Sequence, residues 1–191
     1  MRTRLRLTIF MAVFFAGTGS LQAGDFFDIS EAAILSRVQD LTSAQYAGRG
    51  SGTVEGNAAA ELLGQWFEDQ GLLPGFGVSF FQEFQLTGQG WAGDSLEGKT
   101  GKNVAAILPG KGELATRYLI LGAHHDHLGR IEPSLSGQGP AAPLSFYAGA
   151  NDNASGLAVL FELIEILKTD TSDSRRSVLF VCFGGEEVGL Q

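Results

Sequence analysis

The segment Val178–Glu187, with the sequence VLFVCFGGEE, decides the fold of this 191-residue chain. Six successive apolar residues are typical of a strand that is buried on both faces of a sheet. Gly184 and Gly185 then end the strand, and Glu186 follows at its carboxyl end beside Glu187. Sites in open α/β sheets form outside the carboxyl ends of the strands. The segment therefore predicts a central strand that leads into a functional site.

The rest of the chain predicts alternating strands and helices. Apolar patterns indicate strands over residues 78–86, 103–108, 117–123 and 176–183, and helices over residues 31–41, 55–70 and 156–168. Because strands alternate with helices, we expect an α/β fold with a mixed, mostly parallel central sheet and helices on both faces. In the last helix, Glu162, Glu165 and Lys168 are expected to form a narrow solvent-exposed stripe.

The first 23 residues have the pattern of a secretory signal peptide. Three arginines precede an apolar run over residues 7–17, and the small residue Ala23 marks the expected cleavage site. A membrane anchor is the alternative, but a spanning helix needs about 20 apolar residues and this run is shorter. We expect residues 24–191 to be exported to the periplasm or the extracellular space, with no stable membrane association after the signal is removed.

The composition is that of a globular protein with one domain. Hydrophobic residues make up 44% of the chain and charged residues 18%, which excludes an intrinsically disordered protein. The formal net charge of -8 argues against nucleic acid as a partner, because phosphate binding needs a basic surface. The single cysteine, Cys182, lies within the apolar strand, so we interpret it as a buried thiol.

A histidine cluster follows the strand over residues 117–123. A zinc-bound imidazole usually donates its second ring N–H to a carboxylate, so we assign His124 as a metal ligand and Asp126 as its partner. His125 and His127 are alternative ligands, but the alternation of a strand places them away from that side. An exposed polar loop is the alternative interpretation of the cluster.

A lone carboxylate, Asp152, lies in the glycine-rich segment GANDNASG over residues 149–156. Aspartate is common as a helix cap, and that role is the alternative here. The small residues around Asp152 indicate close backbone packing about one carboxylate. A carboxylate can bridge two metal ions through its two oxygens, and paired metal ions are a common catalytic arrangement.

The third cluster is the acidic pair Glu186 and Glu187. Two adjacent carboxylates at the end of a buried strand repel each other, and a bound cation would relieve that repulsion. We interpret Glu187 as a metal ligand and Glu186 as the group that takes a proton from water and passes it to the leaving amine. The alternative is a solvated pair at the start of a helix, where the dipole favours acidic residues.

With these three motifs the chain resembles the secreted di-zinc exopeptidases. The matching segments are GAHHDHLG over residues 122–129, GANDNASG over 149–156 and FGGEEVGL over 183–190. This family includes bacterial leucyl aminopeptidases, aminopeptidases S and Y, glutamate carboxypeptidases and glutaminyl cyclases. The resemblance covers roughly residues 32–191. It implies a zinc-dependent exopeptidase fold of the phosphorylase/hydrolase-like type, two zinc ions and hydrolysis of N-terminal residues from a peptide substrate.

The resemblance also implies individual roles. His124 is expected to bind one zinc ion, Glu187 the other, and Asp152 both, with Glu186 as the general base. The bond between Asp152 and Asn153 is expected to be cis. The family pattern needs a later Asp and a later His, which the 191 residues do not contain. We therefore expect residues 24–191 to be the N-terminal part of a catalytic domain that is truncated at its C-terminus and inactive alone.

Two alternatives to an aminopeptidase follow from the same residues. A carboxypeptidase or a glutaminyl cyclotransferase of the same fold would use the same ligands on a different substrate. A non-catalytic exported module would have kept the fold and lost the reaction. The general base Glu186 weighs against the non-catalytic module, and the two missing ligands weigh for it.

Overall fold

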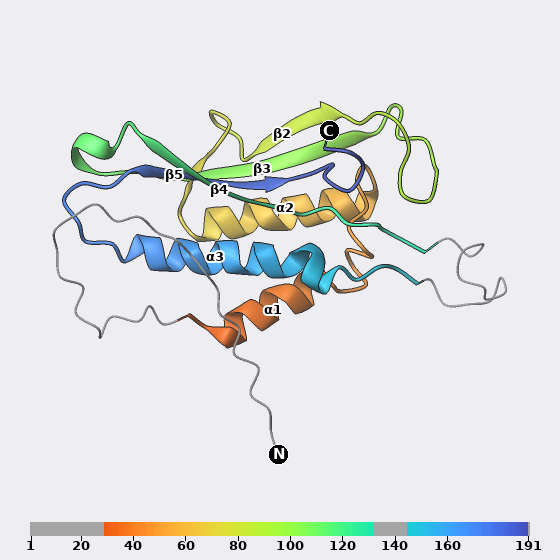
Figure 1. Ribbon diagram of the computed structural model, residues 1–191, viewed down its shortest axis with the longest axis horizontal. Helices are drawn as coiled ribbons and strands as arrows, with labels where there is room; N and C mark the ends of the chain where they lie inside the picture. The colour runs from red at the N-terminus through yellow and green to blue at the C-terminus, as the bar shows by residue number, and fades with distance from the viewer. Residues whose placement is uncertain (1–28, 132–144, 191) are drawn as a thin grey trace, which may run out of the picture.

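A computed structural model describes residues 29–131 and 145–190 of the chain. The expected signal peptide and most of the connection before Asp152 lie outside the described residues. Within them, a five-stranded sheet lies on one side and three helices lie on the other (Figure 1). None of the helices in these two ranges is long and apolar enough to cross a membrane.

The helices agree with the sequence prediction to within one residue at each end. They are α1 (Glu31–Leu41), α2 (Val54–Asp69) and α3 (Ser155–Lys168). The side chain of Ser30 caps α1, because its hydroxyl oxygen accepts a hydrogen bond of 3.1 Å from the backbone N–H of Ala33.

The strands are β1 (Leu73–Pro74), β2 (Phe81–Gln85), β3 (Thr100–Leu108), β4 (Tyr118–His124) and β5 (Ser177–Phe183). β5 lies between β3 and β4 in the sheet. Most of its side chains are buried, which confirms the prediction of a central strand. β4 pairs in parallel with β5 in the register that sets His124 opposite Phe183. The two strands therefore end at the same edge.

The sheet is mixed, which confirms the α/β class, but its described strands are not mostly parallel. β4 and β5 form the one parallel pair among them, and β1, β2 and β5 all pair antiparallel with β3. A loop without a helix joins the antiparallel strands β2 and β3, whereas α3 provides the crossover between the parallel strands β4 and β5. The sequence predicts helices on both faces of the sheet, whereas the three described helices all cover one face (Figure 1).

The core lies between the sheet and these helices. Phe161 of α3 packs edge-on against Trp66 of α2 and stacks on Phe67, with ring centroids 5.2 and 4.8 Å apart. Phe180 of β5 is fully buried in the same cluster. Large aromatic side chains bury the most apolar area per residue, so this contact fixes α2 and α3 beneath β5.

Glu162 is buried, although the sequence predicts that its side chain is exposed. It accepts a hydrogen bond of 3.0 Å from the backbone N–H of Ser30 and forms an ion pair with Arg37 of α1. The helical pattern of α3 could not show this, because α1 packs over the polar stripe of α3 and supplies its donors. Glu162 therefore holds α1 against α3.

Replacing Phe161 with alanine should lower the free energy of unfolding by about 3–5 kcal/mol, because it leaves a cavity at the contact between α2 and α3. Val159 lies on the same helix with 46% of its surface exposed, against 1% for Phe161, so Val159→Ala is the matched control. That control should cost no more than about 0.5 kcal/mol. Chemical denaturation measures both, and equal losses would contradict the packing described here.

Candidate metal centre

The three polar clusters meet beyond the ends of β4 and β5. One potential ligand atom each from His124, Asp152 and Glu187 lies within 4.8 Å of the other two. Nε2 of His124 is 3.0 Å from Oδ1 of Asp152. The structure thus brings together the three residues that the sequence proposes as ligands. Their binding of a metal stays a prediction.

This set of donors suits zinc. An imidazole nitrogen and carboxylate oxygens are ordinary zinc ligands in hydrolases. Two further carboxylates, those of Asp126 and Glu186, lie close by, with oxygens 3.8 and 3.9 Å from Nδ1 of His124. A cation among these acids would relieve their repulsion. The Asp152 side chain is 61% exposed, so the centre is open to solvent and to a substrate.

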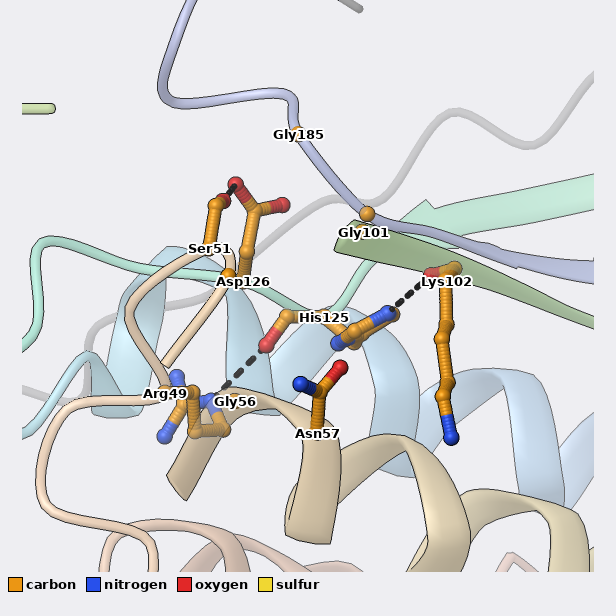
Figure 2. Close-up of a pocket in the computed structure, with 11 residues that line it drawn as sticks. Arg49, Ser51, Gly56, Asn57, Gly101, Lys102, His125, Asp126 and Gly185 are labelled. Carbon is orange, nitrogen blue, oxygen red and sulfur yellow. Dashed lines mark hydrogen bonds between the residues drawn. The ribbon is translucent and has the colours of Figure 1, made fainter. Parts of the chain in front are cut away.

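Asp126 has a different set of partners from the predicted one. Its carboxylate is buried and accepts hydrogen bonds from the backbone N–H groups of Glu186 and Glu187 at 3.2 and 3.1 Å. It also accepts a bond of 2.6 Å from the hydroxyl of Ser51 (Figure 2). A buried carboxylate needs such donors, because its desolvation is otherwise uncompensated. Asp126 therefore fixes the backbone that carries both glutamates.

The ring of His124 is oriented by the backbone of Asp126 and not by its carboxylate. Nδ1 of His124 lies 3.2 Å from the backbone carbonyl oxygen of Asp126, against 3.8 Å from its carboxylate. A carbonyl can only accept, so the tautomer that bonds there carries its proton on Nδ1. Nε2 then faces Asp152 with a free lone pair, as a metal ligand requires.

His125 points away from the three candidate ligands, as strand alternation predicts. Its ring is buried, and Nε2 lies 2.8 Å from the backbone carbonyl oxygen of Lys102 on β3 (Figure 2). Burial lowers the pKa of His125 below its ordinary value, so the ring is neutral at pH 7.

His127 differs from the sequence interpretation, which placed it away from the ligands. Its Nδ1 lies 2.7 Å from Oε1 of Glu187. The alternation rule fails here because β4 ends at His124, so the backbone beyond that residue is no longer an extended strand.

Arg49 is a structural residue of the centre that the sequence prediction missed. Its guanidinium is fully buried and donates hydrogen bonds of 2.7–3.0 Å to four backbone carbonyls, those of Leu41, His125, Ala148 and Gly149. Burial lowers the pKa of Arg49 to about 10, while the carboxylates of Asp126, Asp152 and Glu187 oppose that shift. The group stays charged at pH 7 and ties the clusters together. Glycines on both sides of Arg49 were the available signal.

The turn before Asp152 is closely packed. Gly149 has a φ of 60°, and a Cβ added there would lie 2.5 Å from the backbone oxygen of Asp152 and from Cδ2 of His127. Only glycine fits that position without a shift of its neighbours. The peptide bond between Asp152 and Asn153 is cis, as the resemblance predicts.

A known protein family matches the segment that contains this site. Residues 103–191 match the model of peptidase family M28, a range that contains His124, Asp152, Glu186 and Glu187. Over this segment, the chain is similar to peptidase family M28. The predicted resemblance to the zinc exopeptidases is thereby confirmed.

Two curated relatives of the chain are aminopeptidases by name. Aminopeptidase NAALADL1 of Mus musculus is 36% identical over 99 residues, which are 50% of this chain and 11% of that protein. Aminopeptidase YwaD of Bacillus subtilis is 47% identical over 45 residues, which are 24% of this chain and 10% of that protein. The matches therefore span only a small part of each relative.

Solved structures share the fold of this chain. The zinc aminopeptidase BSAP from Bacillus subtilis aligns with a TM-score of 0.62 at 14% identity, over 86% of this chain and 63% of that one. The glutaminyl cyclase of Porphyromonas gingivalis aligns with a TM-score of 0.56 at 20% identity, over 83% of this chain and 49% of that one. At these identities the similarity establishes the fold and leaves the reaction open.

Replacing Arg49 with alanine should lower the free energy of unfolding by at least about 3 kcal/mol, because each buried carbonyl left without a donor costs about 1–3 kcal/mol. Arg49→Lys should recover only part of the lost stability, because lysine keeps the charge but lacks the planar guanidinium with its several N–H donors. Arg130→Ala is the control, because Arg130 is 41% exposed and pairs with Glu55 at the surface. It should cost no more than about 1 kcal/mol. Urea denaturation that gave the same loss for Arg49→Ala and Arg130→Ala would contradict this role.

Proposed function

We propose that the site serves a zinc-dependent aminopeptidase, exported from the cytoplasm, that hydrolyses N-terminal residues from peptides. The convergence of His124, Asp152 and Glu187 at one sheet edge, with Glu186 beside them, carries this proposal. His124 would hold one zinc ion, Glu187 a second, and Asp152 would bridge them. When bound, zinc polarises the scissile carbonyl and makes water a stronger nucleophile at neutral pH.

We assign the proton transfer to Glu186. Its carboxylate is 40% exposed, with Oε2 3.9 Å from Nδ1 of His124, so it borders the ligands without belonging to the cluster of three. It would accept a proton from the attacking water and return it to the leaving amine. Its backbone is fixed by Asp126, and this holds the base beside the reacting atoms. Asp126 thus contributes as a positioning residue.

An aminopeptidase is favoured over a glutaminyl cyclotransferase by the sequence relatives. Both curated relatives above carry the name aminopeptidase, whereas the glutaminyl cyclase shares only the fold. Assays of the active enzyme can separate the activities. Release of nitroaniline from an aminoacyl-nitroanilide supports the aminopeptidase, release of ammonia from an N-terminal glutamine supports the cyclotransferase, and cleavage that requires a free carboxylate supports a carboxypeptidase.

In the active enzyme, Glu186→Gln should lower kcat by at least about 10²–10⁴-fold, because the general base is lost. Its zinc content should not change, since no proposed ligand is removed. Glu187→Gln is the matched control from the adjacent position and should lose zinc together with activity. Near-parental kcat in Glu186→Gln would show that Glu186 is not the base, and metal analysis shows whether the two glutamates differ.

The 191-residue chain alone should hold zinc weakly and should not hydrolyse an aminoacyl-nitroanilide. Three candidate ligands lie in the described residues, and sharing Asp152 leaves two protein donors for each of two ions. Catalytic zinc sites normally offer three. The test is to purify the chain, add zinc, and measure bound metal and nitroaniline release. Robust hydrolysis, or two tightly bound ions per chain, would contradict this ligand count.

A further inference from the structure

His127 makes the closest contact with a candidate ligand that the proposed reaction does not use. Its Nδ1 lies 2.7 Å from Oε1 of Glu187, and the two side chains are only 11% and 17% exposed. A carboxylate can only accept at neutral pH, so the ring donates from Nδ1. A hydrogen bond to an ionised acceptor that is sheltered from water is stronger than one between neutral groups.

The backbone and the ring of His127 are each held by one further contact. The backbone N–H of His127 donates a hydrogen bond of 3.1 Å to the carbonyl of Arg49, the residue that also binds the carbonyl of Gly149. The Cδ2 edge of the ring packs on Gly149, where an added Cβ would lie 2.5 Å away. The imidazole therefore lies between the Glu187 carboxylate and the turn that leads to Asp152.

We propose that His127 is a positioning residue that holds the Glu187 carboxylate at the distance from Asp152 that a metal ion needs. This inference rests on the proposed metal centre. A glutamate side chain has several rotatable bonds, and restricting them lowers metal affinity unless another contact has already fixed the carboxylate. The bond from Nδ1 occupies one lone pair of Oε1 and leaves acceptor positions for a cation.

His127 acts through Glu187 and is not itself one of the ligands. The residues that can share an ion in the described part of the chain are His124, Asp152 and Glu187, and His127 is not among them. Its nitrogen nearest to this group is already engaged by the Glu187 carboxylate. Removing a side chain that hydrogen-bonds to a metal ligand typically lowers metal affinity by about 10–100-fold.

Three substitutions at His127 separate the hydrogen bond from the packing of the ring. Asparagine places an N–H donor close to the position of Nδ1, glutamine places its donor farther out, and alanine removes it. The zinc dissociation constant is measured by competition with a metal indicator, with the melting temperature of each metal-free protein recorded beside it. Glu55→Gln is the control, because it breaks the nearby surface pair with Arg130 and touches no candidate ligand.

His127→Ala and His127→Gln should weaken zinc binding by about 10–100-fold. His127→Asn and Glu55→Gln should bind zinc as the parent does. Parental affinity in His127→Ala would overturn the inference, and so would a loss in His127→Asn equal to that in His127→Ala, because the ring would then act by packing alone.

A second measurement needs no metal. The melting temperatures of His127→Ala, Glu187→Gln and the double variant are compared in metal-free protein. Residues that bond each other are not independent, so the double variant should lose less than the sum of the two single losses. Additive losses would overturn the inference. A parent that binds no zinc even at saturating zinc concentration would refute the proposed metal centre. The comparison of melting temperatures would then decide the contact by itself.

Discussion

The buried carboxylate of Asp126 is the contact on which the rest of the site depends. Asp126 lies just beyond β4, and its carboxylate oxygens accept hydrogen bonds from the backbone N–H groups of Glu186 and Glu187, which lie beyond β5. Parallel pairing brings the two strand ends to one edge, and this carboxylate then sets how their loops meet. Because the Asp126 backbone carbonyl also orients His124, one residue positions a proposed ligand from each strand.

The fold class and the three candidate ligands could be predicted from the sequence because each carries a local signal. The unbroken apolar run of β5 indicates a buried strand, and helix periods and caps set the helix ends. His124, Asp152 and Glu187 each follow or precede such an element, so topology alone places two of them together. The parallel share of the sheet could not be predicted in this way, because pairing direction depends on which strands become neighbours.

Arg49 and His127 could not be assigned from the sequence because their partners are far away in it. Arg49 binds backbone carbonyls up to 100 residues away in the sequence. Every residue has a backbone carbonyl, so the sequence does not show which ones Arg49 binds. His127 meets Glu187 only because β4 has ended, so a rule for strands no longer applies to it. The predicted exposure of Glu162 on α3 is wrong for the same reason, because Arg37 of α1 and the backbone N–H of Ser30 bind its carboxylate.

We propose that His124, Asp152 and Glu187 bind two zinc ions, with Asp152 shared between them. X-ray diffraction from crystals grown with zinc, recorded at the zinc absorption edge, locates the ions directly by their anomalous signal. We expect two peaks, one at about 2.0–2.2 Å from Nε2 of His124 and the other at about 2.0–2.2 Å from a carboxylate oxygen of Glu187, each also bound by an oxygen of Asp152. A zinc peak on other side chains, or crystals in which these three residues bind no ion at saturating zinc, would contradict it.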